Sequence, residues 1–273
     1  MGYIKENTLL SKILYFGEKM IYKYSDSVIF TMEGGKQYII DKKWDKEIDL
    51  KKIHYINNGV DLEKFRELEK NSFKDEDLDN DKFKIIYTGT IARTNNVKRI
   101  VDIAERINED KRIIFLIYGD GEEKEELEEY CKNLNLDNVV FKGKVNKNKI
   151  PYILTRANAT ITDSIIITSK INVNKYGVSY NKLFDYLAAR KPIIKLVASE
   201  YDIVEKNNCG IILSEKNSLK DNLMKIKKIL NISLEDIKKG IQEFKLTKNR
   251  MDILEKNHKT IIDGTYNASV DSM

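Results

Sequence analysis

The sequence predicts an α/β fold with a doubly wound parallel sheet, and two observations carry this prediction. Between residues 84 and 213, short apolar segments alternate with amphipathic ones, which is the order of strands and covering helices in a parallel sheet. Glycines follow the apolar segments closely, at Gly89, Gly119, Gly121 and Gly143. Ligands of such sheets bind at the carboxyl ends of the strands, so we expect the functional site at this edge.

The elements of this sheet follow one another along the middle of the chain. Segments rich in Ile, Val, Phe and Tyr favour strands, and apolar residues recurring at three- and four-residue spacing favour helices. We expect strands at 84–88, 112–118, 138–141, 158–163, 192–195 and 209–213. We expect helices at 96–108, 122–134, 147–156 and 180–190. Lys191-Pro192 ends the last of these helices.

The first 60 residues form a separate group of elements. Leu9, Ile13, Phe16 and Met20 share one face of a predicted helix. We expect a strand at 27–32, a short helix at 35–41 and a strand at 53–56 to follow. One amphipathic helix and two isolated strands cannot build a core of their own, so we expect another protein surface to cover them.

The remaining segments are polar. We expect the charged run 67–82 to be a linker, residues 233–262 to form one or two Lys-rich helices, and the tail from Gly264 to be frayed. Segment 163–171 is unusually apolar for a loop, and we interpret it as a lid or as part of a buried strand.

Composition restricts the class of protein. The net charge of +5 is mild and mixed along the chain, which suits anionic small ligands or an anionic membrane surface and argues against nucleic acid as the partner. Cys131 and Cys209 stand alone and are expected to be reduced core residues of a cytoplasmic protein. The start of the chain does not match a signal peptide, and we expect no membrane span.

The segment from Tyr176 to Pro192 is the most informative motif. It predicts a helix with Ser179 as N-cap and with Asn181, Lys182 and Asp185 on its first turns. A helix N-terminus beside a lysine is suited to bind a phosphorylated ligand. The alternative interpretation is an ordinary capped surface helix.

Together with four other segments, this motif resembles a known family. In order these segments are 57–65, 84–90, 113–121, 139–145 and 176–192. The set resembles the C-terminal half of family 4 glycosyltransferases of the GT-B fold, over about residues 20 to 230. The likeness is greatest to members that build bacterial surface polysaccharides from nucleotide-activated amino sugars.

The resemblance implies an incomplete enzyme. Residues 1–66 would be a remnant of the N-terminal acceptor domain with a linker, 67–230 the donor-binding domain, and 231–273 C-terminal helices and a tail. The implied reaction moves a hexosyl or amino-sugar group from a nucleotide-diphosphate sugar, expected to be UDP-linked, to a polysaccharide or lipid-linked acceptor. A partner chain would supply the missing half, or the chain would self-associate through residues 9–60. The helix at 9–24 could also lie on the inner face of the membrane, with Lys12, Lys19 and Lys23 over anionic headgroups.

The resemblance also implies roles for individual residues. Lys182 and, after it, Arg93 would stabilise the leaving diphosphate without a bound metal or cofactor, and Lys98 ranks third. Asp185 would bind the ribose hydroxyls and the backbone of Lys144 and Val145 the base. Gly119 and Gly121 would leave room for the ligand. Gly89, Ser179 and Asn181 complete the expected donor site. The competing interpretation of each lysine is a solvated surface charge, and that of Asp185 a favourable helix-dipole charge.

Three positions depart from the family pattern, and two other functions stay open. Gly177 stands where many members have a glutamate, and Tyr180 and Arg190 are expected to put bulk near the binding face. These changes favour a non-catalytic nucleotide-sugar binder or scaffold as the alternative. A dinucleotide-dependent oxidoreductase is the third interpretation, but Gly119-Asp-Gly121 lacks a third glycine and is followed by four nearby carboxylates. His54 is expected to be structural.

Overall fold

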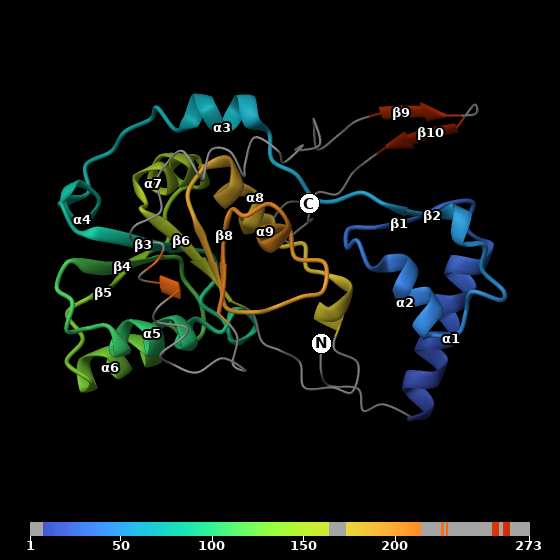
Figure 1. Cartoon of the computed structure of the whole chain (residues 1–273), viewed down its shortest axis with the longest axis horizontal. Helices are drawn as coiled ribbons and strands as arrows, with labels where there is room; N and C mark the ends of the chain where they lie inside the picture. The colour runs from blue at the N-terminus through green and yellow to red at the C-terminus, as the bar shows by residue number, and fades with distance from the viewer. Residues whose placement is uncertain are drawn as a thin grey trace. The chain divides into compact units, whose positions relative to one another are not determined.

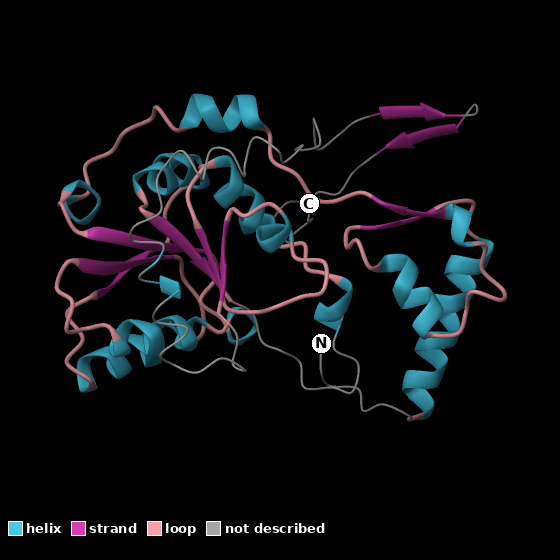
Figure 2. Cartoon of the chain, in the orientation of Figure 1, coloured by secondary structure: helices cyan, strands magenta, loops and turns pink. Residues whose placement is uncertain are grey.

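The computed structural model describes residues 8–163, 173–213, 225–226 and 228, together with the strands at 253–256 and 259–262 (Figures 1 and 2). The chain divides into two compact units. The smaller comprises Met1–Asn57, Ile166–Ser179 and Ser199–Asp202, and the larger comprises the rest. Each unit is described by itself.

The larger unit is built on a six-stranded sheet with the order β5-β4-β3-β6-β7-β8. Its strands are β3 (Phe83–Thr88), β4 (Ile113–Tyr118), β5 (Val139–Gly143), β6 (Ala159–Thr162), β7 (Ile193–Lys195) and β8 (Gly210–Ile212). Every neighbouring pair is parallel. The predicted doubly wound parallel sheet is therefore confirmed. Strand order runs outward from β3 on one side and from β6 on the other, so the topological switch point lies between these two strands.

Helices cover both faces of this sheet (Figure 1). They are α3 (Leu62–Leu68), α4 (Glu76–Asp79), α5 (Val97–Arg106), α6 (Lys124–Asn133), α7 (Ile150–Arg156), α8 (Asn181–Ala188) and α9 (Ile203–Lys206), with 3-10 turns η2 (Arg93–Asn95) and η3 (Lys147–Lys149). Successive residues of β3 serve opposite faces. Ile86 packs in the core cluster with α3, α7 and α8, whereas Ile85 and Tyr87 pack in the cluster with α5 and α6. Because both faces are buried, the strands read as continuous apolar runs.

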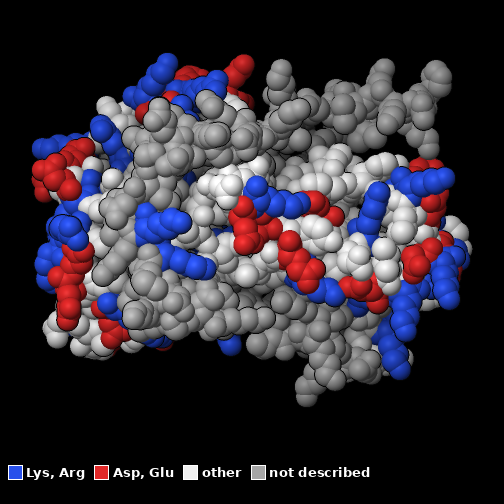
Figure 3. Space-filling model, in the orientation of Figure 1, with Lys and Arg blue, Asp and Glu red and all other residues white. Residues whose placement is uncertain are grey.

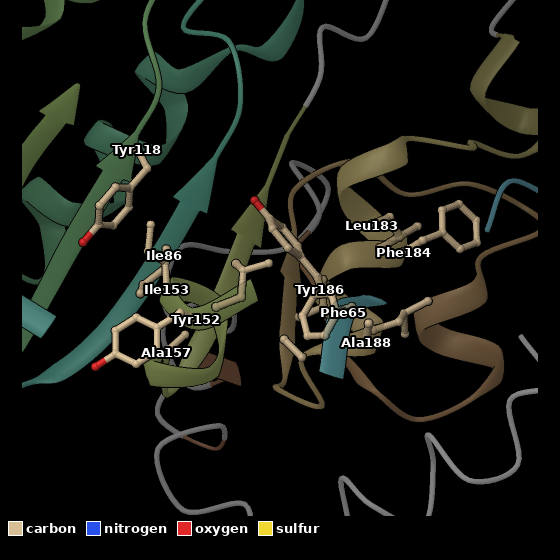
Figure 4. Packing of buried hydrophobic residues seen from close by; sticks show 14 of the residues in the cluster. Phe65, Ile86, Tyr118, Tyr152, Ile153, Ala157, Leu183, Phe184, Tyr186 and Ala188 are labelled. Carbon is tan, nitrogen blue, oxygen red and sulfur yellow. The ribbon is translucent and has the colours of Figure 1, made fainter. Parts of the chain in front are cut away.

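The first of these clusters is shown in Figure 4. Leu183, Phe184 and Tyr186 enter it from α8, and Ile153 enters it from α7. These four side chains are almost completely buried. Helix α8 is thus held to the sheet by its apolar face, and the position of its N-terminus follows from that packing.

The segment predicted as a charged linker has structure of its own. It contains the end of α3 and all of α4, whose N-cap Asp75 accepts a hydrogen bond from the Asp77 backbone N–H at 3.1 Å. The Asp75 carboxylate is buried and binds the Lys142 Nζ at 2.8 Å and the Tyr118 hydroxyl at 2.9 Å. A charge that is paired in this way can be buried. Composition does not reveal such a pair, and it therefore suggested a solvated segment.

The C-terminal region also differs from the expectation. Strands β9 (Ile253–Lys256) and β10 (Lys259–Ile262) form an antiparallel pair within the range predicted as helical. Each segment has two adjacent aliphatic residues, and the two segments are separated by two residues, which is the spacing of a hairpin. Residues 233–252, the tail from Gly264 and the predicted lid beyond Asp163 lie outside the described residues.

The smaller unit contains the elements predicted for the first 60 residues. Helix α1 (Leu9–Tyr24) is capped by Thr8, and β1 (Val28–Phe30) pairs in parallel with β2 (Ile53–Tyr55). Helix α2 (Gly35–Asp41) and the 3-10 turns η1 (Leu50–Lys52) and η4 (Val173–Tyr176) complete it. His54 lies in β2, where it is exposed.

The core of the smaller unit is small and aromatic. Ile39 and Trp44 are buried in it, and Tyr38 packs edge-on against Trp44 with ring centroids 6.0 Å apart. The carboxylate of Glu18 accepts hydrogen bonds from the Tyr22 and Tyr38 hydroxyls, both at 2.9 Å. These contacts hold α1 and α2 together through one side of α1.

The other side of α1 is apolar and exposed. The exposed fractions are 76% for Leu9, 58% for Ile13, 63% for Phe16 and 77% for Tyr24. Among the helices formed by the described residues, none combines the length and apolar character that a membrane crossing requires. On the face shown in Figure 3, the acidic and basic side chains of the described residues are interspersed, as expected from the mild net charge.

Candidate functional site

The candidate site lies at the switch point of the larger unit, where β3 and β6 end side by side. The hydroxyl of Tyr186, from α8, accepts a hydrogen bond from the Thr88 backbone N–H at 2.9 Å and lies 3.3 Å from the Ile161 carbonyl oxygen. In Figure 4 the Tyr186 ring extends from α8 toward the strands. Burial raises the pKa of this phenol to about 12, so it stays protonated and can donate. Tyr186 therefore connects α8 to the ends of both strands.

Lys182 lies on the first turn of α8 and extends to the loop that follows β3. Its Nζ is 2.8 Å from the Asn95 Oδ1 and 3.3 Å from the Tyr87 hydroxyl oxygen, and lies 4.7 Å from the centre of the Tyr87 ring. Burial lowers the pKa of Lys182 to about 8, although the Asp163 carboxylate acts in the opposite direction. The Lys182 ammonium is thus held by two neutral acceptors in an environment that is partly shielded from solvent.

A buried carboxylate, Asp163, follows β6 on the same edge of the sheet. It accepts a hydrogen bond from the Asn96 Nδ2 at 2.9 Å, and an Arg99 nitrogen lies 3.7 Å from its other oxygen. Arg99 also donates to the Leu196 carbonyl after β7 at 2.8 Å. Sequence reasoning did not select Asp163, Asn95 or Tyr87. The position of Asp163 at the end of a predicted strand was the available signal.

The glycines of the site join two neighbouring loops. The Gly89 N–H donates to the Tyr118 carbonyl at 3.0 Å, and the Ile91 N–H donates to the Asp120 carbonyl at 2.8 Å. A Cβ on Gly119 would lie 1.8 Å from the Gly89 carbonyl oxygen, and one on Gly121 would lie 2.3 Å from that of Ile91. Both glycines also have positive φ angles, 155° and 154°. The space that was expected to serve the ligand is taken by the backbone of the adjacent loop.

Gly89 is next to Lys182, whereas Arg93 and Lys98 lie elsewhere on the following turn and helix. A Cβ on Gly89 would be 3.6 Å from the Lys182 Nζ. Arg93 is exposed on η2. The Lys98 Nζ binds Asp102 at 2.8 Å and lies 4.5 Å from the centre of the Tyr130 ring of α6. The bond to Asp102 raises the pKa of Lys98.

Lys144 and Val145 follow β5 at the same edge of the sheet. Lys144 is exposed. Val145 is partly buried and packs against the core cluster that includes α7 and α8.

The prediction that Ser179 is the N-cap of α8 is wrong. Tyr180 occupies the cap position and makes no side-chain capping bond. The Ser179 hydroxyl instead donates to the Asn57 Oδ1 at 2.8 Å within the smaller unit. The helix begins with Asn181. Asn181 and Asp185 are four positions apart on α8, so their partly buried side chains lie on one face.

The two bulky substitutions lie at opposite ends of α8. The Tyr180 ring is at the N-terminal end, with its centre 6.0 Å from the Lys182 Nζ. Arg190 follows the C-terminal end, where its guanidinium pairs with Glu69 at 3.1 Å. The expected bulk near the N-terminus of α8 therefore comes from Tyr180 and not from Arg190.

Chemically, the site combines one ammonium group, side-chain amides and the first N–H groups of an eight-residue helix. Such a set suits an anion with several oxygen atoms, because ammonium and backbone N–H groups both donate to it and the helix dipole favours negative charge.

Comparisons with known proteins show the family and the fold. The family model described as "Glycosyl transferases group 1" matches residues 69–243. An uncharacterized glycosyltransferase of Methanocaldococcus jannaschii, MJ1069, is 25% identical over an alignment of 272 positions that covers 96% of this chain and 61% of that protein. The chain thus spans less than two thirds of this curated relative.

Two solved structures show the same fold. Anabaena Alr3699/HepE in complex with UDP has a TM-score of 0.62 at 14% identity, covering 87% of this chain and 63% of that one. WaaG, a glycosyltransferase involved in lipopolysaccharide biosynthesis, has a TM-score of 0.61 at 13% identity, covering 86% and 63%.

Proposed function

Because the chain belongs to the group 1 glycosyl transferases, we propose that it binds a nucleotide-diphosphate sugar at the end of β3 and β6. The sugar, a hexose or amino sugar, is transferred to a polysaccharide or lipid-linked acceptor. The binding of UDP by the similarly folded HepE supports a UDP-linked donor, and the lipopolysaccharide role of WaaG supports a surface glycan as acceptor. We assign the chain to the family 4 type within the group.

The observation that carries this proposal is the position of Lys182. It places a partly buried ammonium group beside the N-terminus of α8 and at the switch point, where ligands of such sheets bind. Departure of the sugar leaves growing negative charge on the diphosphate oxygens. A preorganised cation in a site of low dielectric can lower such a barrier by about 3 kcal/mol.

We propose roles for the other residues on the same basis. Arg93 is a second cation for the diphosphate, exposed on the loop after β3, and Lys98 is a weaker third because Asp102 already engages it. Asp185 binds the ribose, and Lys144 and Val145 bind the base through their backbone. Asn181 binds the donor from the first turn of α8, and Gly89, Gly119 and Gly121 shape the loops around the site. On this proposal, Lys182 and Arg93 stabilise the leaving diphosphate without a resident metal.

Calorimetric titration of the purified chain tests the proposal. We expect UDP to bind with micromolar affinity, GDP to bind more weakly, and a dinucleotide not to bind. Lys182→Ala should weaken UDP binding about tenfold, since charge-assisted contacts are worth ~1.5–3 kcal/mol. Lys111→Ala is the control, because Lys111 pairs with Asp137 on the surface at 2.7 Å. A folded chain that binds none of these nucleotides would refute the donor site.

The proposed domain organisation assigns residues 67–230 to donor binding and residues 1–66 to the acceptor side, with 231–273 C-terminal to both. The described residues of the smaller unit form a two-stranded parallel sheet, and one face of α1 is apolar and exposed. Parallel sheets are normally larger and covered on both faces. We therefore propose that a complementary polypeptide, supplying further parallel strands and their helices, covers α1.

A fusion tests this partner. The part of MJ1069 that this chain does not match is joined to the chain, and amide hydrogen exchange of residues 9–24 is measured with and without it. Slower exchange of α1 in the fusion supports the partner, and unchanged exchange refutes it. Protection of α1 in the unfused chain that grows with its concentration, or appears with anionic vesicles, would assign the surface to self-association or to a membrane instead.

We propose a cytoplasmic location, in which the buried thiols of Cys131 and Cys209 stay free.

A further inference from the structure

Asn95 has a fixed orientation next to Lys182. It ends the turn η2, and its Nδ2 donates to the Thr90 carbonyl oxygen at 3.0 Å. Only the amide nitrogen can donate, so this bond directs the Oδ1 away from Thr90. That oxygen lies 2.8 Å from the Lys182 Nζ.

Tyr87 is oriented by the same carbonyl group. Its hydroxyl donates to the Thr90 oxygen at 2.9 Å, which leaves the phenol oxygen as an acceptor for Lys182 at 3.3 Å. Two acceptors of Lys182 are therefore oriented by one backbone atom. An ammonium group has three N–H donors, and among the described residues these two contacts engage two of them, so the third is proposed to serve the ligand.

Both acceptors are neutral, and this has an electrostatic consequence. A carboxylate at the position of Asn95 would fix the ammonium equally well, but it would cancel its charge and repel an anionic ligand. The nearby carboxylate of Asp163 is held by Asn96 and lies 3.7 Å from an Arg99 nitrogen. The Lys182 ammonium is thus held in position by neutral groups, and its positive charge can attract an anionic ligand.

We propose that Asn95 is a positioning residue, which holds the Lys182 ammonium at the switch point for the diphosphate of the donor without neutralising it. The assignment rests on the function proposed above, and it adds a requirement for a neutral acceptor at this position. Asn95 acts through Lys182 and need not contact the donor.

Two substitutions at this position separate charge from geometry. Asn95→Asp keeps an acceptor and adds a charge, whereas Asn95→Leu removes the acceptor. We expect both variants to weaken UDP binding, Asn95→Asp by about tenfold or more and Asn95→Leu several-fold. Asn71→Asp and Asn71→Leu are the matched controls, since Asn71 is exposed in the same unit. UDP affinity unchanged in both Asn95 variants would overturn the proposal.

A second readout does not depend on UDP. The titration of Lys182 is followed by NMR in the ligand-free protein after isotopic labelling of the lysine side chains. Asn95→Asp should raise the pKa of Lys182, because a carboxylate favours the ammonium form, and Asn95→Leu should lower it. Opposite shifts support the positioning role even if UDP does not bind, in which case only the proposed function fails. Equal or absent shifts would refute the role of Asn95.

Discussion

The hydroxyl of Tyr186 lies 2.9 Å from the backbone nitrogen of Thr88, although the two residues are 98 positions apart in the chain. This bond fixes α8 to the last residue of β3, at the point where β3 and β6 end. Lys182 lies on the same helix one turn earlier, so the position of its ammonium group depends on this buried contact.

Replacing Tyr186 by Phe should destabilise the chain and weaken UDP binding. The Thr88 N–H would lose its partner in a buried environment, which costs about 1–3 kcal/mol. Urea denaturation measures the free energy of unfolding, and Tyr24→Phe is the control because Tyr24 is 77% exposed. Equal losses for the two variants would contradict this explanation.

The affinity for UDP should fall as the pH rises through about 8, the value to which burial lowers the pKa of Lys182. Only the ammonium form attracts the diphosphate, and the terminal phosphate has lost its second proton above about pH 7, so it does not obscure the effect. We expect nearly constant affinity from pH 7 to 7.5 and a decrease approaching tenfold per pH unit well above 8.

Two measurements check this pH dependence. Calorimetry in buffers of different ionisation enthalpy should show proton uptake on binding above pH 8. Lys182→Arg, whose guanidinium stays charged, should bind with little pH dependence up to pH 9. A wild-type profile that is flat to pH 9 would show that another group binds the diphosphate.

Gly119→Ala should unfold much of the population or lower stability by at least about 3 kcal/mol. The new Cβ would lie 1.8 Å from the Gly89 carbonyl oxygen, at a residue with a φ of 155°. Gly17→Ala is the matched control, because nothing lies within 4 Å of a Cβ there. Gly17 is within α1, so its replacement should stabilise the chain by about 0.5–1 kcal/mol. Thermal melts of the two variants distinguish these outcomes.

Lys142→Met should destabilise the chain at neutral pH by about 3 kcal/mol, because it leaves the buried Asp75 carboxylate without its cation. Burial by itself would raise the pKa of Asp75, but hydrogen bonds from Lys142 and Tyr118 outweigh it and lower that pKa below 3.8. The stability due to this pair is therefore present above pH 3.8 and is lost as the pH falls through the lowered value.

Removal of the cation should reverse this dependence. In Lys142→Met the pKa of Asp75 rises above its ordinary value, so the variant should recover stability, relative to the wild type, as the pH is lowered from 7 to 4. The double variant Lys142→Met/Asp75→Asn should restore part of the loss at pH 7. A loss that is independent of pH would indicate a packing defect and not an unpaired charge.

The sheet could be predicted from sequence because strands buried on both faces are continuously apolar, as β4 is from Ile113 to Tyr118. The helix at 181–188 followed from its apolar spacing and from Pro192. The contacts of the site could not be predicted in the same way. Whether Ser179 caps a helix or binds Asn57, and whether Lys98 faces a ligand or Asp102, is decided by side chains brought near by folding.

The same reason explains why Asn95 and Asp163 were not selected. Each is a common polar residue in a loop, and its importance arises from an ammonium group or an amide that is distant in sequence. Asp75 was concealed in a similar way, since the Lys142 that permits its burial is 67 residues away.

The smaller unit is assembled from separated stretches of chain, and this determines the order in which its contacts can form during synthesis. The Tyr176 hydroxyl donates to Asp41 at 2.8 Å across 135 residues, and the Gly34 N–H donates to the Tyr176 carbonyl at 2.8 Å. A ribosome adds about 5–20 residues per second, so α2 waits on the order of ten seconds for these partners. The central strands β3 to β6 leave the ribosome during that interval. The ring of Tyr38, whose centroid lies 5.3 Å from that of Tyr176, therefore lacks this contact while the central strands are being synthesised.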